Sequence, residues 1–258
     1  MEEILGQLAD SFLGSTSNPS HRALLYLKGK REDLIVNALS ETLIKLDDTR
    51  RISAEYGLRS DEITAWNRTL KSRGYFSGSS GLKREKIHGR VDLTCLDPAD
   101  LPVELIEVKA WSATDAVDES RYLDSKQYNH SLLKSFEIDA LKMQAVNVAK
   151  SATNMIVTAI FTVHCDGLSI QQMTEKGLSY VSLLNKQNSD KAKIGSSDDY
   201  RMAGVNQIMN QFNAKFGSGT ELNAKFTHVY AFNRNQAFLD GVGLSLDLIG
   251  AEFKQLSN

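Results

Sequence analysis

The residue types best suited to catalysis lie between Gly89 and Trp111, where two strand-like runs flank a turn. The first run carries Asp92, and the second carries Glu107 and Lys109. Carboxylate oxygens bind Mg²⁺, which polarises a phosphate and lowers the pKa of a bound water. A lysine nearby can orient or help deprotonate the attacking water, and it can offset negative charge in the transition state. These residues predict metal-assisted phosphodiester hydrolysis, with Asp92 and Glu107 as ligands of Mg²⁺, or of Mn²⁺ as a substitute.

A β-hairpin is the element that must position these side chains. Asp97-Pro98 is a turn signal, because proline cannot donate to a strand ladder and biases the preceding residue away from helix. Side chains alternate along a strand, so Glu107 and Lys109 share one face. If the two strands pair in register, we expect Asp92 to reach the same metal ion as Glu107.

The Glu-x-Lys tripeptide carries little information without this context. The chain has a second one at Glu252-Phe253-Lys254, and an Asp-x-Lys at Asp124-Ser125-Lys126. Neither follows a strand with an upstream aspartate. The alternative for the hairpin is that its charged residues sit at the end of a half-exposed strand pair and only neutralise one another.

A helix is expected over residues 30–46, where apolar side chains form a stripe: Ile35, Ala38, Leu39, Leu43 and Leu46. Glu32 falls on the side of this stripe. An acidic residue on a buried face is unfavourable unless it has a partner or a metal. Glu32 is therefore the candidate for a third carboxylate of the site. The alternative is that Glu32 only favours the helix N-terminus through the macrodipole.

The rest of the pattern predicts further helices and strands. Helices are expected over 2–13, around 61–70, and over 124–150, 168–184 and 200–216, and strands over 155–164 and 225–232. A strand end and a loop are expected in 74–81, a polar loop in 186–199, and residues 241–250 receive no assignment. Up to residue 165, the order is helix, three strands, helix and strand.

Composition limits the class of protein. The chain has 258 residues, with 41% hydrophobic and 24% charged, as in an ordinary globular protein. No apolar run approaches the roughly 20 residues that span a bilayer, so no membrane association is expected. Acidic Glu2 and Glu3 are unlike the start of a secretory signal. These features predict a cytoplasmic protein.

Two cysteines and two histidines fall in predicted strands. Cys95 and Cys165 are expected to be small buried side chains in a reducing compartment, not a disulfide or a metal site. His164 and His228 are expected to serve the core or its rim and not catalysis.

The net charge is −2, but its distribution along the chain is uneven. Residues 1–90 carry 15 Lys and Arg against 12 Asp and Glu, whereas residues 91–150 carry 6 against 11. The basic residues that gather before or at the hairpin include Lys28, Lys30, Arg31, Arg50, Arg51, Lys71, Arg73, Lys83, Arg84, Lys86 and Arg90. A basic rim around an acidic metal pocket suits a phosphodiester substrate. The alternative is a solvated surface of mixed charge.

The order of elements, with Asp92 and Glu107-x-Lys109 on adjacent strands, resembles the PD-(D/E)xK nuclease superfamily, which includes type II restriction endonucleases. Residues 29–35 also resemble the first-helix pattern of these enzymes. The resemblance assigns the family's helix glutamate to Glu32, its metal aspartate to Asp92, and its glutamate and lysine to Glu107 and Lys109. It covers about residues 28–165 and departs at Val91, where the family pattern has proline.

The resemblance implies an α/β fold with a restriction-endonuclease-like core: a mixed β-sheet flanked by helices, with a C-terminal α/β extension. Residues 1–170 would form the nuclease core with an N-terminal helical region, and residues 171–258 a recognition or oligomerisation extension, unless the two are one continuous domain. It implies an Mg²⁺-dependent endonuclease acting on double-stranded DNA, as a type II restriction or antiphage defence enzyme. Cleavage of both strands would call for a homodimer or a partner subunit.

Two alternatives remain open. The near-neutral charge and the unassigned C-terminal third also fit a nuclease-fold subunit that lacks its own catalysis and acts as a DNA-binding or assembly component. The second alternative is an unrelated α/β hydrolase. The sequence contains no Gly-x-Ser-x-Gly, phosphate-binding loop or His-Glu-x-x-His to support it.

Overall fold

The computed structural model describes residues 1–14, 31–75, 89–112, 132–148, 152–178, 181–195, 197–232, 237–239 and 241–254. Its helices are α1 (Glu2–Gly14), α3 (Arg31–Leu46), α4 (Ser60–Ser72), α7 (Leu132–Gln144), α8 (Ile170–Glu175), α9 (Val181–Ile194) and α10 (Ser197–Phe216). Its strands are β1 (Arg51–Gly57), β2 (Arg90–Leu96), β3 (Pro102–Ser112), β4 (Thr153–His164), β5 (Lys225–Phe232), β6 (Ala237–Leu239) and β7 (Val242–Lys254).

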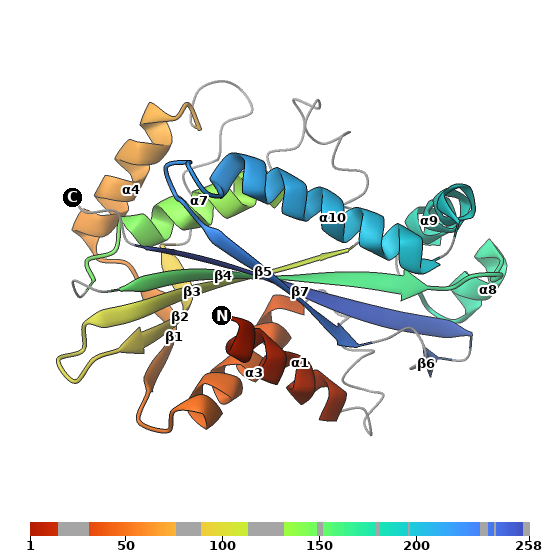
Figure 1. Cartoon of the computed structure of the whole chain (residues 1–258), viewed down its shortest axis with the longest axis horizontal. Coiled ribbons are helices and arrows are strands. Elements are labelled where there is room, and N and C mark those ends of the chain that lie inside the picture. Colours follow the sequence, from red (N-terminus) through yellow and green to blue (C-terminus); the bar gives the residue numbers. More distant parts are fainter. Residues whose placement is uncertain are drawn as a thin grey trace.

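The described strands form one mixed sheet in the order β1-β2-β3-β4-β7-β5, with β6 added beside β7. Strands β3 and β4 are parallel, and every other described pair is antiparallel. Helices cover both faces of the sheet (Figure 1). This arrangement confirms the prediction of an α/β protein with a mixed sheet flanked by helices.

Each face of the sheet has its own apolar core. Helices α1 and α3 pack on one face through Leu5 and Leu39, which are fully buried. Helices α4, α7 and α10 lie on the opposite face, where Trp66, Phe136 and Phe212 are buried. Figure 1 shows these two layers on either side of the strands. Below, the second face is called the α7 face.

Strand β4 is the centre of the sheet. It is buried from residue 154 to residue 164, as expected for a continuous apolar strand that is covered on both faces. On one side it pairs in parallel with β3 from Glu104 to Ser112. On the other side it pairs with β7 along its whole length. The core therefore holds β3, and the charged residues on it, in a fixed register.

The unassigned residues 241–250 form most of β7, a long strand between β4 and β5. Burial on both faces removes the alternation that would have identified this strand. At Gly250, a Cβ atom would crowd the side chains of Met1 and of Leu5 on α1, so these side chains pack directly on the strand backbone. The segment after residue 170 thus contributes strands to the same sheet as β1 to β4.

Two further elements differ from the sequence-based expectation. Strand β1 was not expected, because an edge strand with largely exposed side chains has no apolar alternation. A strand end was expected in 74–81. Gly74 and Tyr75 instead close the last turn of α4 through backbone hydrogen bonds, and residues 76–81 lie outside the described part.

The helices after β4 also differ. The single helix expected over 168–184 is instead α8 and the first turn of α9. Helix α8 begins with a Ser169–Gln172 capping box and ends before Gly177, which has a positive φ of 69°. The prediction of a polar loop over 186–199 is wrong, because helix α9 extends to Ile194. Amide side chains anchor α9 to the end of β4, with Gln187 Nε2 donating to the Val163 carbonyl at 2.6 Å.

The helix expected over 124–150 is α7 within the described residues, and residues 124–131 lie outside them. In the described ranges, every helix is too short or too polar to cross a bilayer.

Candidate functional site

The candidate site lies where β2 separates from β3. The two strands pair up to Leu93 and Ile106, and β3 then continues for six residues beside β4. Asp92 is the first residue beyond the last pair, and its Oδ2 accepts a hydrogen bond from the Val108 backbone N–H at 2.8 Å. A side-chain carboxylate thus satisfies a backbone donor that the neighbouring strand no longer reaches.

Strand β2 changes the face on which it packs at this point. Leu93 belongs to the core beneath α1 and α3, whereas Val91 belongs to the core on the α7 face. Regular alternation would place both on one face. The residue facing Asp92 in the register of β1 is Glu55, whose φ of 51° is left-handed. Strand β2 is therefore irregular at Asp92. Among the described residues, β3 has no strand partner on this side beyond Ile106.

Glu32 reaches the same open edge from the other side of the sheet. It lies in the first turn of α3, and its Oε1 accepts a hydrogen bond from the Ala110 backbone N–H at 3.3 Å. The residue is exposed, but atoms packed around its carboxylate remove water and raise its pKa, while Lys109 opposes the rise. The expected place of Glu32 on a buried helix face is not seen. Its carboxylate nevertheless has a protein partner at β3.

Glu107 and Lys109 project onto the α7 face, where they meet two residues of that helix. Lys142 Nζ lies 2.5 Å from Glu107 Oε1 and 3.1 Å from Asp139 Oδ1. Lys109 Nζ lies 3.0 Å from Asp139 Oδ2 and 3.8 Å from Glu107 Oε2. These four residues, Glu107, Lys109, Asp139 and Lys142, are called the four-charge cluster below. Two acids and two lysines alternate within it.

Burial and mutual charge set the protonation of the four-charge cluster. Loss of water raises the pKa of Glu107 to about 8, against the lowering effect of Lys142. Burial also opposes the charge on Lys109, but Asp139 and Glu107 outweigh it and raise the pKa of this lysine. For Asp139, the two lysines outweigh burial and lower its pKa. At neutral pH, Lys109 is therefore a cation and Asp139 an anion.

The structure brings the sequence-predicted residues to one place. Asp92 and Glu32 accept hydrogen bonds from the Val108 and Ala110 N–H groups of β3. Lys109 lies between these two residues on the strand, and Glu107 immediately precedes Val108. Asp92 and Glu32 also act electrostatically on the four-charge cluster, since the charge of Asp92 contributes to the raised pKa of Glu107.

Sequence reasoning missed Asp139 and Lys142. The apolar stripe of α7 was recognised, but the two charged residues inside it were not. Both are buried and lie three residues apart, so they share one side of the helix. An acidic and a basic residue three positions apart within an apolar helix stripe could have identified this buried ion pair from the sequence.

The donor chemistry of Asp92 and Glu107 fits a hard divalent cation. Within the described ranges, no group of three or more His, Cys, Asp or Glu side chains has metal-binding geometry. Mg²⁺ needs only one or two carboxylates, because it keeps several waters. A buried glutamate whose pKa is raised next to a second carboxylate is a place where added positive charge is favourable. Asp92 and Glu107 would hold the ion.

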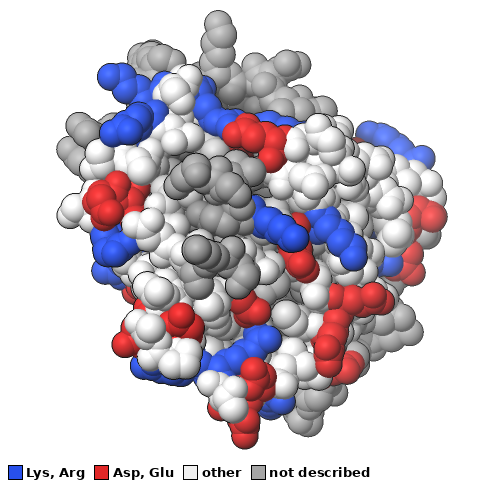
Figure 2. All heavy atoms as spheres, turned by 60° about the vertical axis from the view of Figure 1, so that its left-hand side comes forward, with Lys and Arg blue, Asp and Glu red and all other residues white. Residues whose placement is uncertain are grey.

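Four arginines of the expected basic rim form ion pairs in the described part of the chain: Arg50, Arg51, Arg73 and Arg90. Arg50 contacts Glu104 at 2.9 Å, and Arg51 contacts Asp100 at 2.7 Å. Figure 2 shows Lys and Arg side chains interspersed with Asp and Glu on this side of the molecule. Lys28, Lys30, Lys83, Arg84 and Lys86 lie outside the described residues. The described part of the rim is thus a surface of mixed charge.

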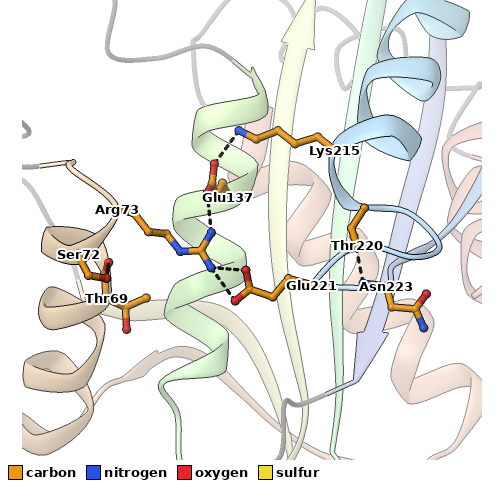
Figure 3. A network of polar contacts seen from close by, with 8 residues as sticks. All are labelled: Thr69, Ser72, Arg73, Glu137, Lys215, Thr220, Glu221 and Asn223. Carbon is orange, nitrogen blue, oxygen red and sulfur yellow. Dashed lines mark hydrogen bonds and ion pairs between the residues drawn. The ribbon is translucent and has the colours of Figure 1, made fainter.

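A surface network holds α7 against its neighbours. Arg73 of α4 binds Glu137 of α7 at 3.1 Å and Glu221 at 2.5 Å. Lys215 of α10 binds the same Glu137 at 2.6 Å, as Figure 3 shows. Glu137 precedes Asp139 by two residues. The network therefore ties the helix that supplies Asp139 and Lys142 to α4 and α10.

A second buried ionic group lies on the same face of the sheet, further along it. Asp247 of β7 is fully buried, and its Oδ1 contacts Arg201 Nη1 at 2.5 Å and His228 Nε2 at 2.8 Å. These three residues are called the Arg201 cluster below. The guanidinium of Arg201 also stacks 4.1 Å from the ring centroid of Tyr230. As expected, His228 stands at the rim of the core, and His164 is buried beside Ser245.

Comparisons with family models, curated proteins and solved structures gave no match to this chain.

Proposed function

We propose that this protein is an Mg²⁺-dependent endonuclease that hydrolyses phosphodiester bonds of double-stranded DNA. The observation that carries the proposal is the meeting of Asp92, Glu107 and Lys109 where β2 leaves β3. The restriction-endonuclease-like character of the core is part of this proposal. It is supported by the antiparallel β1-β2-β3 unit, followed by α7 and the parallel strand β4.

Each residue has a role that follows from its contacts. Asp92 and Glu107 would hold the ion, which when bound polarises the phosphate and acidifies a water. Asp92 is fixed for this task by its hydrogen bond to the Val108 N–H. Lys109 is a cation because Asp139 and Glu107 raise its pKa against the effect of burial. It would therefore orient the water and offset transition-state charge, and it would not act as the base.

Glu32 is the third carboxylate of the proposed site. Its hydrogen bond to the Ala110 N–H holds it at the open edge of β3, next to the strand that carries Glu107 and Lys109. From this position it would bind a water of the metal shell and not the metal itself. A defence or restriction role, and a homodimer or partner subunit that supplies a second active site, belong to the same proposal.

The test is cleavage of supercoiled plasmid with Mg²⁺ or with EDTA. We expect cleavage by the wild type only with metal, none by Asp92→Asn, and a loss of at least about 100-fold in Lys109→Met. The matched control is the double variant Glu252→Gln, Lys254→Met, which removes the second Glu-x-Lys of the chain and should cleave like wild type. Equal cleavage by Lys109→Met and wild type would overturn the proposal.

A second candidate is a nuclease-fold subunit without its own catalysis. The four-charge cluster favours it, because two lysines already neutralise two carboxylates in the absence of any metal. This candidate predicts that purified protein binds DNA but neither binds Mn²⁺ nor cleaves. Calorimetric titration of Mn²⁺ separates the two candidates.

A further inference from the structure

Lys142 lies against a carboxylate oxygen of Glu107 that a bound metal would need. Its Nζ lies 2.5 Å from Glu107 Oε1, and its side chain is 7% exposed. Lys109 faces the other oxygen of the same carboxylate at 3.8 Å. One oxygen of Glu107 is therefore in close contact with an ammonium group that comes from α7.

The net charge around this contact matches that of one divalent cation. Four carboxylates, those of Glu32, Asp92, Glu107 and Asp139, interact with the two lysines of the four-charge cluster. With every group ionised, the sum is −2. A divalent cation would bring the sum to zero, and it would compete with Lys142 for Glu107.

We infer that Lys142 is a tethered counter-ion that stands in for the metal at Glu107 and must leave this carboxylate when a divalent cation binds. The inference rests on the proposed function, because it assumes that Glu107 is a metal ligand. It assigns Lys142 a regulatory role: this lysine occupies one oxygen of the buried Glu107 carboxylate without metal and weakens metal binding.

Lys142 has a second anchor that it can keep after leaving Glu107. Its Nζ is 3.1 Å from Asp139 Oδ1 and 6.0 Å from the centroid of the Trp66 ring. A carboxylate and an aromatic face both stabilise an ammonium group. A small movement toward Asp139 and Trp66 would therefore free Glu107 Oε1 without leaving the lysine buried and unpaired.

The experiment is a calorimetric titration of Mn²⁺ into wild type, Lys142→Met and Lys134→Met. Lys134 is on the same helix but lies over the Tyr75 ring, so its variant is the matched control. Loss of one positive charge next to the ion should tighten Mn²⁺ binding by about tenfold or more. The control should bind Mn²⁺ like wild type.

Thermal unfolding provides a second readout that needs no activity. Without metal, Lys142→Met should melt below wild type, because the buried carboxylate of Asp139 loses one of its two ammonium partners. Saturating Mn²⁺ should raise the melting temperature of the variant by more than it raises that of wild type. If Lys142→Met does not fold, Lys142→Gln replaces it in both measurements, since its amide can still donate to Glu107.

The outcomes separate this inference from the proposed function. If wild type binds Mn²⁺ through Asp92, but Lys142→Met binds it equally or more weakly, the inference is overturned and the proposed function stands. If neither wild type nor Lys142→Met binds Mn²⁺, both fail. Tighter binding that Asp92→Asn abolishes in the Lys142→Met background supports both.

Discussion

Two buried ionic groups lie on the same face of one sheet, yet they differ in how firmly their charges are held. The four-charge cluster joins β3 to α7, and the Arg201 cluster joins β7 and β5 to α10. The first uses lysines, which are mobile point charges on flexible stems. The second uses an arginine, whose planar group stays charged and stacks on Tyr230.

The sheet around the two groups differs as well. Strand β7 is paired on both sides at the Arg201 cluster, with Asp247 opposite Ile160 and Tyr230. At the four-charge cluster, β2 has left β3, and side-chain carboxylates bind the freed N–H groups. A charged group inside a complete ladder serves the fold. We propose that the charged group at the open edge, which has an excess of carboxylates, exchanges its cation.

Substitution of Arg201 should have the largest effect on stability and none on the proposed metal site. Arg201→Leu leaves Asp247 buried without its main counter-ion, so we expect a loss of about 3–5 kcal/mol in the free energy of unfolding. Urea denaturation measures this loss. Arg201→Lys keeps the charge and should lose less. A loss of Mn²⁺ binding by folded Arg201→Leu would contradict the separation of the two clusters.

The four-charge cluster should make stability depend on pH through Glu107. Folding raises the pKa of this carboxyl from 4.5 to about 8. A carboxyl group whose pKa is raised by folding stabilises the folded state fully when the pH is below its unfolded-state pKa. This stabilisation is lost as the pH rises through the folded-state pKa. In EDTA, the wild type should therefore lose stability from about pH 5 to pH 8 relative to Glu107→Gln. If the unfolding free energies of the two proteins changed with pH in the same way, Glu107 would not be the source of the pH dependence.

The surface network of Arg73 should matter least. Arg73→Ala removes exposed or half-exposed ion pairs to Glu137 and Glu221, and such pairs contribute at most about 1 kcal/mol. We expect a small drop in melting temperature that largely disappears in high salt. Lys71→Ala, on the same helix, is the control. A loss above about 2 kcal/mol would mean that the network does more than steady α7.

Much of the proposed site could be anticipated from local rules. The turn at Asp97-Pro98 and strand alternation correctly put Glu107 and Lys109 on one face of β3. In-register pairing at Asp92 was the condition for a shared metal, but the strands stop pairing at Leu93 and Asp92 instead binds the Val108 N–H. Asp139 and Lys142 were not predicted, because they lie 30 or more residues after Glu107 and Lys109 in the sequence. They contact these residues only through the packing of α7 against β3.

The elements that escaped prediction share a physical reason. Strand β7 is buried on both faces, and β1 is an exposed edge, so neither shows the alternation that marks a half-buried strand. Helix α9 is anchored to the end of β4 by amide hydrogen bonds of Gln187 and Asn188, in addition to the buried side chain of Leu184. In each case a tertiary contact replaces the local pattern.

The most direct measurement is anomalous diffraction from a crystal of the protein soaked in Mn²⁺. We expect one strong peak in contact with the carboxylates of Asp92 and Glu107, with Lys142 Nζ moved toward Asp139 and the Arg201 cluster unchanged. A soaked crystal with no peak at Asp92 and Glu107, and with Lys142 still on Glu107 at saturating Mn²⁺, would contradict the metal-dependent site.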